Sequence, residues 1–417
     1  MSDETLTSDS TPLNEPRLPV TFIESDSAVN HLVEDLRGYD GPICIDAERA
    51  SGFRYGQKAY LIQIAIPASK IYLIDPTADF SKTSWHALAE SANSKPWIIH
   101  AATQDLACLA ECDLVPTQIL DTELASRILG LPRVALGTIT EHYLNLKLAK
   151  EHSAVDWSIR PLPNAWLDYA ALDVDVLFDL WKCVEQDLID RDRMIIAEQE
   201  FAFLLLPSIK EVKTDRWRAM NGLHEIKDQR SLTVAKYLWE ARETLAIEKD
   251  ISPGRLIPDS AIIAAVKAAP RTKSELASLR TFSGRASRTY LDVWWKALSD
   301  GTADKNLVEL RVKSTGIPNH RNWSQKFPEA NARLLTCKAL IAKLSSELKI
   351  PSENIISPEV IRGLCFEPPT PLDFGTLESI LRSKRVREWQ IKYVSDILLV
   401  GLAATSPPEP EAIPETP

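Results

Sequence analysis

The sequence predicts an α/β domain followed by two small all-α domains, with a polar tail at each end. From about residue 18 to residue 206, apolar segments with strand character alternate with helical patterns. From residue 208 to residue 402 the strand signals are absent and apolar residues recur at helical spacing. The 417 residues are enough for about two to four domains, each with its own core.

Both tails are rich in Ser, Thr, Pro and acidic residues, which predicts disorder for residues 1–17 and 403–417. The first residues lack the basic and apolar regions of a secretory signal, and no apolar run is long enough to span a membrane. The six cysteines show neither paired spacing nor zinc spacing, which indicates reduced thiols. We therefore expect a cytoplasmic protein without membrane contacts.

Five strands are expected in the first domain, because five short apolar runs rich in β-branched residues are separated by polar turns. These runs are VTFI (20–23), ICIDA (43–47), AYLIQIAI (59–66), KIYLID (70–75) and WIIH (97–100).

The two helical domains are expected at residues 208–299 and 329–402, joined by a linker at 300–328 that contains Gly, Pro and Asn. Pro258-Asp259 marks a helix start, and Thr272 with Glu275 forms a capping-box pattern. A shift of 99 residues places Leu245 on Leu344. This weak repeat indicates two domains of similar type, with chance as the alternative.

The net charge of −10 is distributed unevenly along the chain. Residues 18–206 hold 15 Lys and Arg against 28 Asp and Glu, a net charge of −13, whereas residues 208–298 hold 17 against 11, a net charge of +6. An acidic domain beside a basic one suits a metal-dependent site coupled to a polyanion-binding module, although such asymmetry also arises by chance.

Two acidic residues, Asp46 and Glu48, occupy an otherwise apolar strand and project from the same face, because they lie two residues apart. Like charges held side by side are unfavourable unless Lys, Arg or a metal ion compensates them. The alternative is a strand whose end reaches solvent.

Further acids join this pair. Asp105 lies after the strand at 97–100, at the start of a helical run, and Tyr169 and Asp173 lie four residues apart on one helix face. Acids are also ordinary in first helical turns and on solvated helices. The four carboxylates together carry a formal charge of −4, which two divalent cations, Mg²⁺ or Mn²⁺, would cancel in a two-metal site for phosphodiester cleavage. A tyrosine one helical turn from a ligand suits orientation of the attacking water.

The motifs IDAE, HAATQDL and YAALD resemble, in order and separation, the three exonuclease motifs of the DEDD superfamily in its tyrosine-bearing branch. The segment KEHSAVDWSIRPLPNAWLDYAALDVDVL is similar to the ribonuclease D family. Further along, LWEARETLAIEKDISPGRLIPDSAIIAAV resembles the helicase-and-ribonuclease-D C-terminal (HRDC) domain, and residues 329–402 resemble a diverged second copy.

The resemblance implies a ribonuclease H-like exonuclease domain with a mixed sheet flanked by helices, followed by HRDC-type domains. It also implies that Asp46, Glu48, Asp105 and Asp173 hold two metal ions and that Tyr169 positions the water. The reaction implied is hydrolysis from the 3′ end that releases nucleoside 5′-monophosphates.

Basic residues near these motifs are candidate RNA contacts. The turn GFRYGQK carries Arg54, Tyr55 and Lys58, and a plain solvated turn is the equal alternative. This turn lacks the spacing of a phosphate-binding loop, so no nucleotide cofactor is expected. In the second domain the candidates for phosphate contact are Arg271, Lys273, Arg285 and Arg288, for which a solvated face is the alternative.

The expected function is a metal-dependent, monomeric 3′-5′ exoribonuclease that trims single-stranded RNA 3′ ends, in tRNA precursor processing or RNA turnover. A DNA 3′-5′ exonuclease is an alternative, because the same carboxylates serve both sugars and only recognition of the 2′-hydroxyl separates them. A non-catalytic RNA-binding scaffold is the alternative from a different class.

Overall fold

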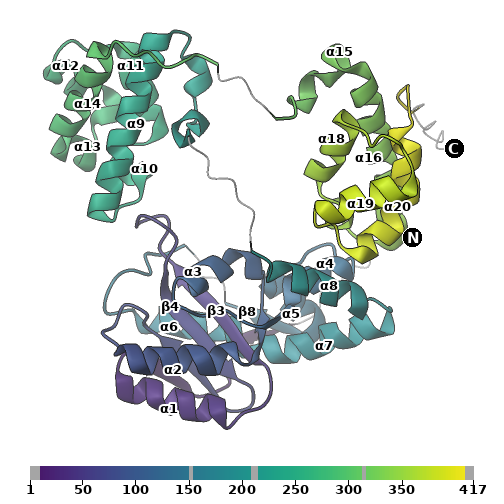
Figure 1. Cartoon of the computed structure of the whole chain (residues 1–417). Coiled ribbons are helices and arrows are strands. Elements are labelled where there is room, and N and C mark those ends of the chain that lie inside the picture. The colour runs from purple at the N-terminus through teal and green to yellow at the C-terminus, as the bar shows by residue number, and fades with distance from the viewer. Residues whose placement is uncertain (1–9, 150–153, 208–214, 312–315, 409–417) are drawn as a thin grey trace.

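The computed structural model describes residues 10–149, 154–207, 215–311 and 316–408. These residues form the α/β domain and the two helical domains expected from the sequence (Figure 1). No helix among the described residues is long and apolar enough to cross a lipid bilayer. All six cysteines are free thiols.

The first domain is built on a six-stranded mixed sheet in the order β2-β5-β4-β3-β6-β7. The β3–β4 and β4–β5 pairs are antiparallel and the other pairs are parallel. The strands are β2 (Val20–Ile23), β3 (Ile43–Arg49), β4 (Ala59–Ile66), β5 (Lys70–Ile74), β6 (Pro96–Ile99) and β7 (Gln118–Asp121). Five of them are the expected strands.

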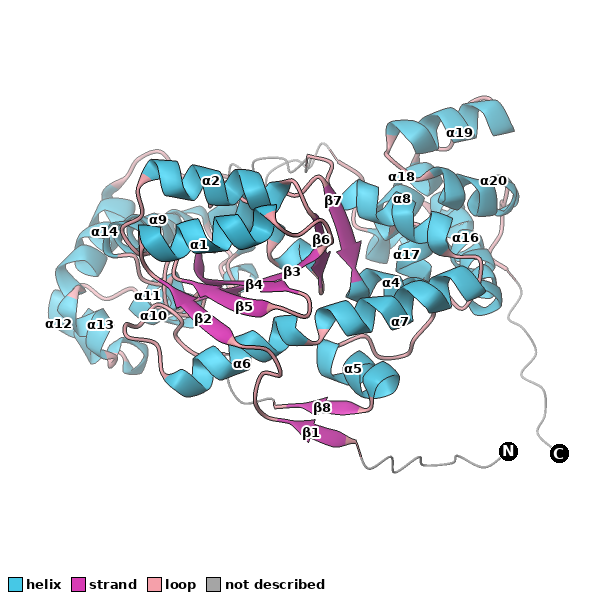
Figure 2. Ribbon diagram, turned by 90° about the horizontal axis from the view of Figure 1, so that it is seen from below, coloured by secondary structure: helices cyan, strands magenta, loops and turns pink. Residues whose placement is uncertain are grey.

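Helices cover both faces of this sheet (Figure 2). One face packs on α1 (Asp26–Arg37) and α2 (Lys82–Asn93), and the other on α6 (Asn164–Asp175) and α7 (Leu177–Asp190). Because both faces are covered, β4 is buried along its whole length, which explains its nearly continuous apolar sequence. The other helical elements of this domain are η1 (Ala102–Gln104), α3 (Leu106–Ala110), α4 (Thr122–Ile128), α5 (Leu136–Leu144) and α8 (Met194–Leu204).

Two parts of the first domain differ from the sequence-based expectation. Strand β7 was not expected, because its four residues, Gln-Ile-Leu-Asp, contain only two adjacent apolar residues, too short a run to indicate a strand. The disorder expected for residues 1–17 is wrong for the described residues 10–17, since β1 (Thr11–Leu13) pairs in parallel with β8 (Leu146–Leu148). Arg17 also forms ion pairs with Asp175 and Asp179, each at 3.0 Å, so the anchor of this segment is remote in sequence. Residues 1–9 and 409–417 lie outside the described residues.

The two helical domains repeat one plan at the offset of 99 residues. The long helix α9 (Gln229–Lys249) corresponds to α16 (Pro328–Leu348), and both end at a residue with left-handed backbone, Asp250 and Lys349. The short helices that follow keep the same offset: α10 (Pro253–Leu256) with α17 (Ser352–Ile355), and α11 (Asp259–Ala268) with α18 (Pro358–Phe366).

The remaining helical elements complete these two domains. In the second domain they are η2 (Arg216–Ala219), η3 (Leu223–Glu225), α12 (Lys273–Ser278), η4 (Arg280–Phe282), α13 (Arg285–Thr289) and α14 (Leu291–Ala303). In the third domain they are η5 (His320–Asn322), α15 (Trp323–Lys326), α19 (Phe374–Ser383) and α20 (Glu388–Leu402). The expected helix start at Asp259 is confirmed, and the Thr272 hydroxyl accepts the Glu275 N–H at 3.1 Å as the capping pattern predicts.

The connection between the helical domains is shorter than the expected linker at 300–328. Helix α14 continues to Ala303, and the fully buried Trp323 belongs to the core of the third domain. Pro318 and Asn319 lie in irregular backbone, and Asn322 belongs to η5, which leads into α15.

Both helical domains dock on the first domain through the turn that follows their long helix. In the second domain, the Ser252 N–H donates to the Phe53 carbonyl at 2.9 Å, and Arg255 stacks 3.9 Å from the centre of the Phe53 ring. In the third domain, Arg193 donates to the Leu348 carbonyl at 2.5 Å, and Lys349 lies against Gly130.

A buried ion pair adds to the contact of the third domain. Arg387 donates to both carboxylate oxygens of Glu200 on α8, at 2.6 and 2.7 Å, and the Trp389 indole N–H donates to the same carboxylate at 2.6 Å. The Glu200 side chain is only 6% exposed, so its charge depends on these donors.

We predict that Glu200→Ala loosens the third domain, because it leaves the Arg387 charge without its partner, at a cost of about 3–5 kcal/mol. Faster hydrogen exchange in residues 328–402 would measure this loosening. The matched control is Glu388→Ala, which removes one of the two acidic partners of the exposed Arg382 and should leave exchange at the domain contact unchanged. Equal exchange in Glu200→Ala and wild type would contradict the prediction.

Candidate active site

The structure brings the four predicted acids and the predicted tyrosine to one edge of the sheet. Asp46 and Glu48 lie in the second half of β3, and Asp105 lies between η1 and α3, after the neighbouring strand β6. Helix α6 packs across β3, β4 and β5 and carries Tyr169 and Asp173. Segments more than 120 residues apart in sequence therefore meet at this edge.

The acids are in contact with one another. The Asp105 and Asp46 carboxyls share a hydrogen bond, and the Asp105 carboxylate also lies 3.3 Å from the guanidinium of Arg49. On α6 the Tyr169 hydroxyl is hydrogen-bonded to Asp173.

Burial and mutual repulsion make the charged forms of these acids unfavourable. Burial is the largest cause that raises the pKa of Glu48, to about 9, and the charges of Asp46, Asp173 and Asp105 add to it. Burial and, to a smaller extent, the charge of Asp46 raise the pKa of Asp105 to about 8. Burial also raises the pKa of Asp46, to about 6. The pKa of Asp173 is also raised well above its ordinary value, by burial and by Asp46. Arg49 opposes the shifts of Asp46, Glu48 and Asp105 but does not cancel them.

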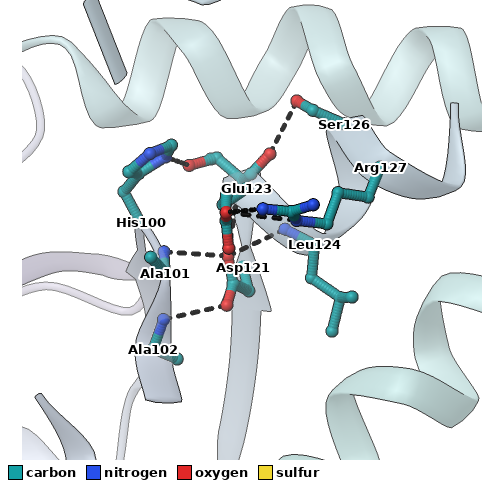
Figure 3. Close-up of polar contacts among 9 residues, drawn as sticks. His100, Ala101, Ala102, Asp121, Glu123, Leu124, Ser126 and Arg127 are labelled. Carbon is teal, nitrogen blue, oxygen red and sulfur yellow. Dashed lines mark hydrogen bonds and ion pairs between the residues drawn. The ribbon is translucent and has the colours of Figure 1, made fainter. Parts of the chain in front are cut away.

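A further buried carboxylate, Asp121 at the end of β7, fixes the turn that leads to Asp105 (Figure 3). It accepts the N–H groups of Ala101 at 3.1 Å and Ala102 at 2.9 Å, and it also caps α4 through two further N–H groups. The donors hold Ala101 in a left-handed backbone conformation, with φ of 60°. Sequence reasoning missed Asp121, although an aspartate directly before the helical run TELASRI is a recognisable N-cap.

The loop before α6 is fixed in a similar way. Arg160 donates to the Asp75 carboxylate at 2.6 Å and to the Tyr60 carbonyl at 2.7 Å, and the neighbouring Trp157 is fully buried. These contacts set where α6 begins, and with it the positions of Tyr169 and Asp173.

The donor set fits divalent cations. Among the described residues, no group of three His, Cys, Asp or Glu side chains is arranged to hold a metal ion. Asp105 instead contacts Arg49 and Asp46. Four crowded carboxylates facing a single guanidinium nevertheless lack positive charge, and hard oxygen ligands suit Mg²⁺ or Mn²⁺. Gln63, the cross-strand partner of Asp46, is fully buried and its amide has no hydrogen-bond partner. This orphaned amide beside Asp46 indicates that the site is completed by a further polar group.

The basic candidates fall into two groups. Arg54 and Tyr55 contact the second domain, because the Tyr55 N–H donates to Asp250 at 3.2 Å and Arg54 lies 3.8 Å from the same carboxylate. The Lys58 Nζ lies 5.0 Å from the centre of the Tyr60 ring.

The other candidates belong to the second domain. Lys273 is paired with Asp292, whereas Arg285 and Arg288 are exposed on α13. Arg271 lines a cavity of about 560 Å³ with Trp295. The exposed arginines stay predicted phosphate contacts.

Three family models match the chain in the order of its domains. The model for 3′-5′ exonucleases matches residues 20–189, the HRDC domain model matches residues 231–298, and the model for a 3′ to 5′ exonuclease C-terminal domain matches residues 316–402.

Known relatives cover most of the chain. Ribonuclease D of Jannaschia sp. is 29% identical over 75% of this chain and 82% of its own length, and ribonuclease D of Bartonella henselae is 27% identical over 76% and 75%. A crystal structure of a protein from Bifidobacterium adolescentis is 30% identical, with a TM-score of 0.81 over 94% of this chain and 100% of its own. Escherichia coli RNase D, described as an exoribonuclease involved in structured RNA processing, has the same fold at 20% identity, with a TM-score of 0.64 over 91% of this chain and 99% of its own.

We predict that the chelated protein loses stability as the pH rises from about 5 to about 9. Because the folded pKa values of Asp46, Asp105 and Glu48 lie above the unfolded values near 4, the native state binds more protons in this range, so its stability falls as those protons leave. Thermal unfolding in EDTA measures this dependence. Asp173→Asn should raise the midpoint at pH 8, whereas Asp168→Asn, an exposed change on the same helix, should not. A lower unfolding midpoint in Asp173→Asn than in wild type would contradict the inference that the acids destabilise the metal-free protein by mutual repulsion.

Proposed function

The chain belongs to the ribonuclease D family of 3′-5′ exoribonucleases, and we propose that it shortens RNA from a single-stranded 3′ end in a reaction that depends on two divalent cations. The observation that carries this proposal is the convergence of Asp46, Glu48, Asp105, Asp173 and Tyr169 at one sheet edge.

The four carboxylates would hold the ions, Mg²⁺ or Mn²⁺. When bound, such ions lower the pKa of water and stabilise the charge on the leaving 3′ oxygen. The residues of the chain supply position: β3 fixes two ligands on one face, Asp121 fixes the turn before the third, and α6 fixes the fourth together with the tyrosine.

Tyr169 orients the attacking water by a hydrogen bond. In the metal-free protein, burial and the charges of Asp173, Glu48 and Asp46 raise the pKa of its hydroxyl, which favours the neutral form that donates a hydrogen bond. Its hydrogen bond to Asp173 leaves it beside the carboxylates, where it is able to hold a water molecule.

The products proposed are nucleoside 5′-monophosphates, and the substrates are RNAs with unpaired 3′ tails such as tRNA precursors. The exposed arginines Arg285 and Arg288 on the basic second domain would contact the RNA backbone. The protein would act as a monomer in the cytoplasm, where six free thiols stay reduced.

Asp46→Asn is expected to lower kcat by about two to four orders of magnitude, because it removes a ligand whose ions contribute several kcal/mol to transition-state stabilisation. Tyr169→Phe is expected to lower kcat less, since only one hydrogen bond to water is lost. The assay follows stepwise shortening of a 3′-tailed RNA and of its DNA counterpart with Mg²⁺, with Mn²⁺ and with EDTA.

The control for these two variants is Asp168→Asn, which changes an exposed acid on the same helix as Tyr169. Full activity in folded Asp46→Asn would contradict the metal assignment. Preferential shortening of DNA would favour the DNA exonuclease, and no shortening of either polymer with any metal would favour an RNA-binding scaffold.

The double variant Arg285→Ala, Arg288→Ala is expected to raise KM for long RNA by about tenfold with little change in kcat, because phosphate contacts add uniform binding energy. The log-log salt dependence of KM should also become shallower, by about one unit for each lost contact. An unchanged KM and salt slope would show that α13 does not contact RNA.

A further inference from the structure

Arg49 occupies an unusual place among the acids of the site. It follows Glu48 directly at the end of β3, where a bulge shifts the pairing so that Arg49 lies opposite Ala59. Its guanidinium Nη2 lies 3.3 Å from the Asp105 Oδ1, and its side chain is 27% exposed whereas that of Asp105 is 7% exposed. One end of the ion pair is therefore buried in the site and the other faces solvent.

The charge of Arg49 is needed before metal ions bind. Four carboxylates at one sheet edge repel one another, and Arg49 is the positive charge that acts on Asp46, Glu48 and Asp105. The contact with Asp105 stabilises the metal-free protein and keeps an oxygen of that proposed ligand engaged.

The same contact opposes metal binding. A guanidinium keeps its proton at any pH at which the protein is folded, so it cannot relieve repulsion from an incoming cation by becoming neutral. The side chain is long and partly exposed, and it is able to turn away from Asp105 towards solvent. The anion that then approaches this edge is the phosphate of the substrate, which arginine binds through two parallel hydrogen bonds.

We propose that Arg49 is an exchangeable counter-cation: it holds Asp105 until divalent cations displace it, and its freed guanidinium then contacts a phosphate of the RNA at the cleavage site. The inference rests on the proposed function and adds to it a residue outside the four acids and the tyrosine.

Opposite effects on metal binding and RNA binding follow from this exchange. Arg49→Gln removes the charge and keeps a polar side chain, so metal ions should bind more tightly, by about tenfold for one charge removed a few ångströms away. RNA should bind more weakly, because a phosphate contact is lost. Arg49→Lys keeps the charge without the paired geometry and should lie between wild type and Arg49→Gln in both properties.

The test is titration calorimetry of the full chain, stripped of metal, with Mn²⁺ in the absence of RNA. Arg133→Gln is the matched control, since it removes an exposed arginine of the same domain. Thermal unfolding in EDTA checks that each variant is folded and should show a lower midpoint for Arg49→Gln than for Arg133→Gln. KM for a 3′-tailed RNA provides the second measurement and should rise in Arg49→Gln.

Each outcome decides between the exchange and the proposed function. Tighter Mn²⁺ binding with a raised KM in Arg49→Gln supports the exchange. Metal-dependent shortening of RNA together with equal or weaker Mn²⁺ binding in Arg49→Gln overturns the exchange and leaves the proposed function intact. No Mn²⁺ binding by the wild type overturns both.

Discussion

The mutual repulsion of four carboxylates at one edge of a sheet is the constraint on which the rest of the first domain depends. The acids come from three separate segments, and each segment is fixed by contacts that do not involve the acids themselves. The sheet fixes Asp46 and Glu48, the Asp121 carboxylate fixes the turn before Asp105, and the Arg160–Asp75 pair fixes the loop before α6. Because rigid scaffolding holds the charges together, the free energy of their repulsion is available to bind cations rather than to open the site.

The docking of the helical domains follows from one repeated structural plan. The turns at Asp250 and Lys349 are equivalent in the two domains, and both contact the first domain, at Phe53 and at Gly130 respectively. The Phe53 contact matters more for the site, because the segment that carries it begins directly after β3 and its acids. Tyr55 extends the contact with a hydrogen bond from its hydroxyl to Glu243 on α9, at 3.2 Å. The second domain therefore restrains the chain just beyond Glu48 and Arg49.

Much of the fold was predictable from local pattern, and what was missed depends on contacts between distant residues. Five strands and the helical repeat were found because their apolar spacing is strong, and the acids were found because two charges in a buried strand conflict with that spacing. Strand β1 was missed because it has only three residues within a polar tail and is ordered by a partner more than 130 residues away, and Arg17 is held by acids on α6 and α7. The local pattern at Asp121 indicates only a helix N-cap, and its hydrogen bonds to Ala101 and Ala102 were missed because they form only in the folded chain. The contact of Tyr55 with the second domain was hidden for the same reason.

The acidic charge of the first domain opposes the approach of a polyanion such as RNA. A polyanion approaching the first domain meets a net charge of −13 over residues 18–206, part of it concentrated in the four acids at the sheet edge. Two divalent cations would cancel the local charge of the acids, but they would leave the remainder of the domain acidic. The second domain carries a net charge of +6 and docks on the segment that follows β3. Under the proposed function, attraction of RNA to the second domain and cancellation of charge at the four acids are therefore two separate contributions.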